Sequence, residues 1–81
     1  MDRPSALELR AFLARHGLTQ SDCARILGRG DNPAKPRSVN RWCSETSTVR
    51  IPFDAAVRLW ALMGETWPPQ EAEKYATAPM R

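Results

Sequence analysis

The stretch TQSDCARILG at residues 19–28 and the stretch RSVNRWC at residues 37–43 decide the fold of this 81-residue chain. Thr19 is a preferred N-cap residue, because its hydroxyl can accept a hydrogen bond from a free amide of the first turn. Gly28 can end the helix that follows, because glycine adopts a left-handed conformation at little cost. Pro36 precedes the second stretch, and proline is tolerated at the start of a helix. We therefore expect two short helices, one in each stretch.

Each of these two helices has an apolar side and a polar side at a spacing close to 3.6 residues. We expect the following residues to face the core: Cys23, Ala24, Leu27, Val39, Trp42 and Cys43. The polar side of the second helix carries Arg37, Ser38, Asn40 and Arg41. The two cysteines lack a CxxC spacing and the chain has one histidine, so we expect no metal site and two buried thiols.

Two further helices are predicted around this pair. Ser5-Ala6-Leu7-Glu8 is a capping box that starts a helix which Gly17 ends. A last helix opens at residues 51–54 and ends at Gly64; its buried stripe is expected to contain Ala56, Leu59, Trp60 and Met63, helped by Val57 and Leu62. No alternating strand pattern occurs, so the fold class is all-α, a compact domain of four to five helices.

We place the folded domain at residues 1–66 and a C-terminal tail at residues 67–81, which contains three prolines. Trp67 is expected to pack onto the body, and residues 70–81 are expected to be frayed. A short helix over 70–77 and a dimer arm are the alternatives for the tail.

Composition excludes several classes of protein. A domain of 9.1 kDa leaves little room for a deep substrate pocket. The longest clean apolar run has five residues, and no apolar segment follows the first four residues, so we expect a cytoplasmic protein without a membrane span or signal peptide. No nucleophile stands in a recognisable arrangement with a base, and no glycine-rich phosphate loop occurs, so we expect neither an enzyme nor a cofactor nor a small-molecule ligand.

Positive charge is concentrated in the middle of the chain. The formal net charge is +3, but residues 25–50 alone carry six basic and two acidic residues. Ten of the twelve basic residues are arginines, whose guanidinium group can form two parallel hydrogen bonds to a phosphate or to guanine. This distribution indicates a surface that meets phosphate groups, with a solvated surface as the alternative.

Together these residues resemble the Cro/repressor-type (XRE-like) helix-turn-helix family. The resemblance is carried by Thr19-Gln20, Ala24, Leu27-Gly28, Val39 and Arg41-Trp42, and it covers about residues 5–64. Among the members of that family, the chain is similar to small autorepressors of phages and mobile elements, such as the anti-CRISPR-associated repressors. One departure is that Gly28 and Val39 are eleven positions apart, about five more than in the tight turn of the family. The extra residues, within 29–35, are either a neutral insertion or a DNA-contacting wing.

The resemblance implies a nucleoid-associated transcriptional regulator, a dimeric repressor that binds an inverted-repeat operator in double-stranded DNA. By position, the residues implied to contact bases in the major groove are Arg37, Ser38, Asn40 and Arg41. Those implied to contact the DNA backbone are Thr19, Gln20, Arg29, Lys35 and Arg50. The alternative is a protein-interaction module with the same fold, an antitoxin-like or adaptor domain that docks through an apolar patch of Trp60, Met63 and Trp67.

Overall fold

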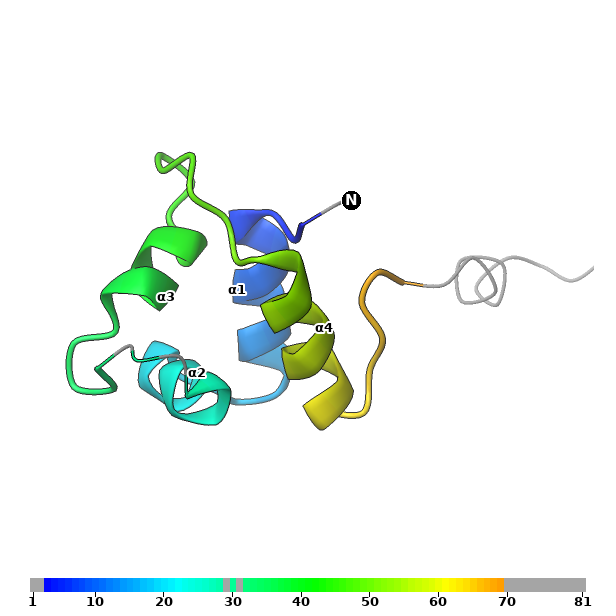
Figure 1. Cartoon of the computed structure of the whole chain (residues 1–81). Helices are drawn as coiled ribbons and strands as arrows, with labels where there is room; N and C mark the ends of the chain where they lie inside the picture. The colour runs from blue at the N-terminus through cyan, green and yellow to red at the C-terminus, as the bar shows by residue number, and fades with distance from the viewer. Residues whose placement is uncertain (1–2, 29, 31, 70–81) are drawn as a thin grey trace, which may run out of the picture.

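Four helices form in the expected order in a computed structural model, which describes residues 3–28, 30 and 32–69. They are α1 (Ala6–Arg15), α2 (Gln20–Leu27), α3 (Arg37–Cys43) and α4 (Phe53–Leu62) (Figure 1). The described ranges contain no strand, only an isolated antiparallel bridge between Asn32 and Lys35. The all-α prediction is confirmed, and the fifth helix considered over 70–77 lies outside the described residues.

The helix ends follow local sequence signals. In α1, Oγ of Ser5 accepts a hydrogen bond from the amide of Glu8 at 3.1 Å, and the Glu8 carboxylate accepts one from the amide of Ser5 at 2.8 Å. Thr19 and Asp22 form the same reciprocal pair at the start of α2, with both distances at 3.0 Å. Gly28 ends α2 with a φ of +59°, in the left-handed region that glycine tolerates. Both predicted N-caps are therefore confirmed.

The core lies where the four helices meet. Helix α3 packs against α1 and α2, and α2 also packs against α4. Phe12 stacks on Trp60 with 3.8 Å between the ring centroids, and Trp67 also packs against Trp60, with 5.2 Å between the centroids. The remaining members of the core are Leu9, Leu13, Cys23, Ala24, Leu27, Val39, Trp42, Cys43, Ile51, Ala55, Ala56 and Leu59. Both cysteines are buried as free thiols, as expected.

The C-terminal part of α4 corrects one expectation. Val57 and Leu62 do not join the buried stripe, because 37% and 57% of their surfaces are exposed. Ala55 takes part in the core instead, and Met63 is only partly buried. The core meets the side of α4 centred on Ala56, Leu59 and Trp60, and Val57 and Leu62 project away from it.

The chain after α4 turns back to cover the core. Trp67, which the sequence places in the C-terminal tail, is only 7% exposed and packs against Trp60. The prediction that this residue packs onto the body is confirmed. The rest of the predicted tail, from residue 70 onward, lies outside the described residues. None of the helices that the structure describes has the length and apolar character needed to cross a bilayer.

Candidate functional site

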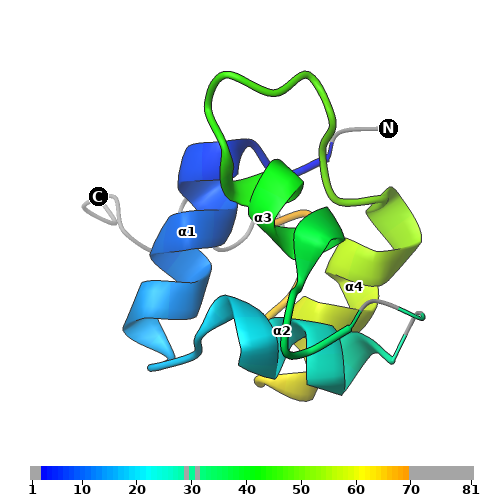
Figure 2. The ribbon, with the colours of Figure 1, turned by 90° about the vertical axis from the view of Figure 1, so that its left-hand side faces the viewer.

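Helix α3 presents its polar side to solvent. Val39, Trp42 and Cys43 are buried against α1 and α2, so helical geometry turns the other side of α3 outward. All four residues expected to contact bases are exposed: Arg37, Ser38, Asn40 and Arg41. Figure 2 views the molecule from this side, where α3 lies in front and no described element covers it.

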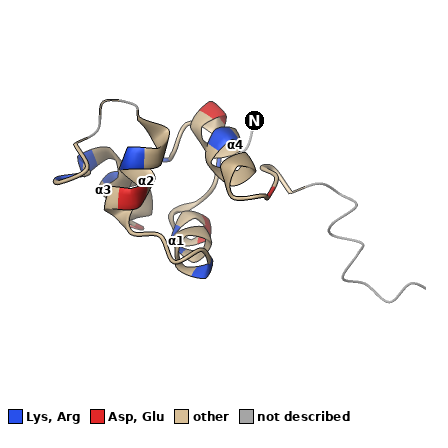
Figure 3. Cartoon of the chain, turned by 90° about the horizontal axis from the view of Figure 1, so that it is seen from below, with Lys and Arg blue, Asp and Glu red and all other residues tan. Residues whose placement is uncertain are grey.

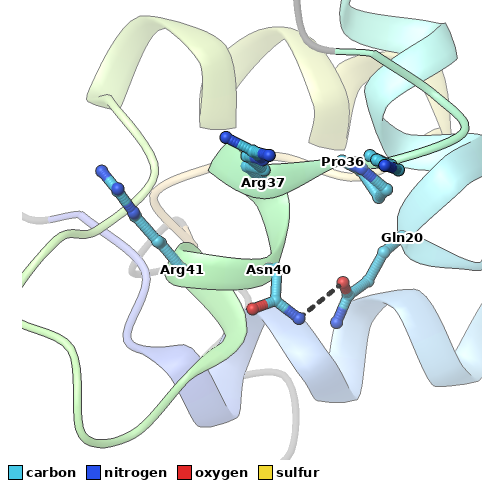
Figure 4. A pocket seen from close by; sticks show the side chains of 6 residues that line it. Gln20, Pro36, Arg37, Asn40 and Arg41 are labelled. Atoms are coloured by element: carbon cyan, nitrogen blue, oxygen red, sulfur yellow. Dashed lines mark hydrogen bonds between the residues drawn. The ribbon is translucent and has the colours of Figure 1, made fainter.

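A groove lies between this side of α3 and the start of α2. Its volume is about 430 Å³, and it is lined by Gln20, Lys35, Pro36, Arg37, Asn40 and Arg41 (Figure 4). Nδ2 of Asn40 donates a hydrogen bond to Oε1 of Gln20 at 3.2 Å, which joins the two helices across the groove. Five residues predicted as DNA contacts therefore meet in one place.

The groove is electrostatically positive. Lys35, Arg37 and Arg41 form no hydrogen bond or ion pair through their side chains with any residue that the structure describes. No carboxylate of a described residue lines the groove. Figure 3 shows basic residues on α3 and on the chain leading into it, whereas α1 and α4 carry charges of both signs.

Three arginines elsewhere on the molecule are paired with carboxylates. Arg10 lies 2.8 Å from Glu45, Arg25 lies 3.1 Å from Asp22 within α2, and Arg15 lies 2.6 Å from Glu65. Within the part of the chain that the structure describes, no carboxylate pairs with Arg37 or Arg41, which leaves their guanidinium groups available to an external anion. An unpaired cation alone does not identify a site, since Arg58 on α4 is also exposed and without a described partner.

The predicted backbone contacts divide into three groups. Gln20 and Lys35 line the groove, and Thr19 lies next to it, where its hydroxyl caps α2. Arg50 lies elsewhere: its Nη1 donates to the carbonyls of Ser47 and Val49, and its side chain lines a separate hollow with Leu7 and Glu45. Arg29 lies outside the described residues.

The capping bonds of Thr19 also act on Asp22. The amide and hydroxyl of Thr19 both hydrogen-bond to Asp22, and the backbone hydrogen bond is the larger cause of the lowered pKa of its carboxyl group. The nearby Arg25 lowers this pKa further. The negative charge of Asp22 is therefore held at the start of α2 and is directed to the helix amides and Arg25.

A second polar cluster had no signal in the sequence. Glu65, just after α4, accepts hydrogen bonds from Nε and Nη2 of Arg15 at 2.9 and 2.6 Å, and it also contacts Nε2 of His16. The hydrogen bond from Arg15, helped by His16, lowers the pKa of Glu65 from 4.5 to about 2. This cluster fastens the end of α4 to the end of α1. Fifty positions separate Arg15 from Glu65, so no local pattern could predict the contact.

The described residues contain no group of three or more histidine, cysteine or acidic side chains that could hold a metal ion. Known protein families, curated proteins and solved structures include none that matches this chain. The geometry around α3 is therefore the basis for any statement about function.

Proposed function

We propose that this protein is a sequence-specific regulator of transcription that binds double-stranded DNA, and that α2 and α3 act as its helix-turn-helix. The observation that carries this proposal is the exposed side of α3, where Arg37, Asn40 and Arg41 line a groove without a described carboxylate. The major groove of B-DNA is about 12 Å wide and admits one α-helix. The negative charge of the phosphates on both sides of that groove complements the cations of this face.

Base recognition is assigned to the side chains of α3. Arg37 and Arg41 can each donate two parallel hydrogen bonds to O6 and N7 of guanine. Asn40 can pair with adenine, because its Oδ1 can accept from N6 while its Nδ2 donates to N7. The hydrogen bond to Gln20 uses one amide hydrogen of Asn40 and leaves the other for the base. Ser38 is exposed on the same helix and can contact either kind of base.

Contacts to the DNA backbone are assigned to residues around α3. Gln20 has an amide group that can donate to a phosphate, and Lys35 offers a compact charge beside α3. We keep Thr19, Arg29 and Arg50 in the same role as part of the proposal, although the guanidinium of Arg50 would have to exchange its bonds to Ser47 and Val49 for a phosphate. Such contacts fix the register of the protein on DNA without reading its sequence.

The proposed regulator is a dimeric repressor located in the cytoplasm with the DNA. A helix of seven residues such as α3 is about 10 Å long and meets only a few base pairs. Two copies related by a two-fold axis would read two half-sites about one turn of DNA apart. Leu62, the more exposed of the two apolar residues on α4, is the residue that we assign to the contact between the copies.

The alternative, a protein-interaction module, gains no support from the aromatic residues that suggested it. Trp60 is 3% exposed and Trp67 is 7% exposed, because both belong to the core. These side chains therefore do not form the exposed patch that a partner protein would need.

The proposal is tested by selection from a pool of duplexes of random sequence, using the purified full-length chain. We expect enrichment of an inverted repeat whose half-sites lie about 10 base pairs apart, with an affinity that falls steeply as salt rises. A pool that shows no enrichment, or a single strand that binds as tightly as the duplex, would contradict the proposal. If the chain does not bind DNA but does bind a partner protein, the result would support the interaction module instead.

A further inference from the structure

The connection between α2 and α3 contains a turn with hydrogen bonds of its own. The amide of Lys35 donates to the carbonyl of Asn32 at 2.9 Å, and the amide of Ala34 donates to Oδ1 of Asn32 at 2.9 Å. Pro33 occupies the second position of this turn, where the fixed φ of proline favours a turn conformation. These bonds fix the backbone between Asn32 and Lys35.

This turn is also tied to the start of α3. The amide of Arg37 donates to the carbonyl of Lys35 at 2.8 Å. The backbone of Lys35 is therefore held on both sides, by Asn32 through its amide and by Arg37 through its carbonyl. Its ammonium group has no described partner, and Lys35 lines the groove together with Arg37 and Arg41.

We infer that the turn formed by Asn32–Lys35 is a phosphate-binding arm, in which Lys35 contacts the DNA backbone next to the bases that α3 reads. This inference rests on the proposed function, which already assigns Lys35 to the DNA backbone, and adds that the turn starting at Asn32 is what positions Lys35 for that contact. Lysine suits this role because its ammonium group is a point charge that binds phosphate without the fork geometry that guanine requires. A lysine whose backbone is held by an ordered turn loses less conformational freedom on binding than one on a flexible loop.

The position of Lys35 distinguishes its role from those of the two arginines. Arg37 and Arg41 are one helical turn apart on α3, whereas Lys35 stands two residues before the helix begins. With α3 in the major groove, a residue outside the helix and beside its first turn lies toward the rim of the groove, where the phosphates are. In this arrangement Arg37 and Arg41 meet the bases of the DNA, and Lys35 meets its backbone.

The experiment measures the affinity of the full-length chain for a labelled duplex of mixed sequence, about 20 base pairs long, over a series of salt concentrations. Lys35→Gln should reduce the slope of log affinity against log salt by about 0.9, and it should weaken binding to every duplex by a similar factor. The matched control is Arg58→Gln, which removes one exposed and unpaired positive charge from α4, away from the groove. It should leave the slope close to that of the wild type.

A second variant tests the turn itself. Asn32→Ala removes the bond to the amide of Ala34 but keeps every charge, so we expect an affinity about three- to tenfold lower with the slope retained, since Lys35 must then be ordered on binding. Thermal unfolding midpoints equal to that of the wild type would exclude a loss of folding as the cause.

Three results would overturn the inference. One is a slope that falls no more for Lys35→Gln than for Arg58→Gln. Another is a loss confined to one base pair, which would make Lys35 a reader of bases. The third is an unchanged affinity for Asn32→Ala. A wild-type chain that binds no duplex would overturn the proposed function together with this inference, whereas these three results, in a wild type that does bind, would overturn the arm alone.

Discussion

Asn40 on α3 donates a hydrogen bond from Nδ2 to Oε1 of Gln20, the first residue of α2, across 3.2 Å. Both side chains line the groove, and the bond is the direct polar link between the solvent-facing sides of the two helices. It orients the Asn40 amide, because one of its two amide hydrogens is directed at a fixed partner. Asn40 thus presents its remaining donor and its Oδ1 acceptor together, as the edge of adenine requires.

This orientation predicts that Gln20 and Asn40 act as a unit. Asn40→Ala should cost about 1–3 kcal/mol of binding free energy at a single base pair of the preferred duplex. Gln20→Ala should cost about 1 kcal/mol and narrow the discrimination at the same base pair, because Asn40 loses its fixed orientation. In the double variant, Gln20→Ala should add little to the loss caused by Asn40→Ala. Binding to the preferred duplex and to its single-base variants measures all three losses.

Ser21→Ala is the matched control, because Ser21 neighbours Gln20 on α2 and does not line the groove. It should bind every duplex as the wild type does. Losses that simply add in the double variant would mean that the hydrogen bond has no part in recognition.

A second prediction separates two properties of Arg41: its positive charge and the two parallel donors of its guanidinium group. Arg41→Ala should cost about 1–3 kcal/mol and relax the preference at one base pair. Arg41→Lys should restore the salt dependence but not the preference, because an ammonium group lacks the two parallel donors that guanine accepts. Titrations of the preferred duplex and of its variant at that base pair, at two salt concentrations, separate these effects. Equal discrimination by the lysine variant would show that Arg41 binds a phosphate.

The sequence was sufficient to predict those structural features that depend on residues close together in the chain. The capping pairs Ser5 with Glu8 and Thr19 with Asp22 each span three positions, and the structure contains both. The inward side of α3 was also predictable, because Val39 and Trp42 are its large apolar residues. The exposure of the charged side of α3 follows from that choice by helical geometry.

Contacts that depend on the path of the chain were not predictable. Val57 and Leu62 are apolar residues on the two flanks of the buried stripe of α4, and only the placement of the other helices decides whether such flanking residues are covered. Arg50 is predicted to contact the DNA backbone, which stays a prediction. The bonds of its guanidinium to carbonyls of the loop that precedes α4 had no signal in the sequence, because no residue pattern reveals the course of that loop.

The pair of Arg15 and Glu65 predicts a dependence of stability on pH. The pKa of Glu65 is about 2 in the folded chain, below its ordinary value of 4.5, because Arg15 binds the ionised carboxylate. The pair therefore contributes its stability above about pH 5, and the contribution is lost as the pH falls through about 4 toward 2. Glu65→Gln should lower the free energy of unfolding at pH 7 by about 1 kcal/mol, since water screens this partly exposed pair.

Urea unfolding of the wild type and of Glu65→Gln at pH 7 and at pH 3 measures this effect. The difference between the two proteins should shrink at the lower pH, because Glu65 becomes protonated in the unfolded wild type but not fully in the folded one. Glu45→Gln provides the control, as the pair of Glu45 with Arg10 is more exposed and should contribute little. A difference that stays constant with pH would show that the carboxylate of Glu65 does not fasten α4 to α1.

The exposed Leu62 at the end of α4 predicts how two copies associate. Leu62 is 57% exposed, so a substitution there should leave the folded monomer nearly as stable as before. Burial of a leucine between two copies would contribute about 1.5–3 kcal/mol, whereas a carboxylate in its place would lose its hydration. Leu62→Glu should therefore convert a dimer at micromolar concentration into a monomer, as measured by equilibrium sedimentation, and weaken binding to the inverted repeat more than binding to one half-site.

Leu7→Glu serves as the matched control, because Leu7 is 59% exposed and lies on α1 rather than on α4. The control should sediment as the wild type does and bind the inverted repeat with wild-type affinity. If the wild type is itself a monomer, both alone and on the inverted repeat, then α4 is not a dimer surface. If both leucine variants dissociate equally, the interface extends beyond α4 and includes α1.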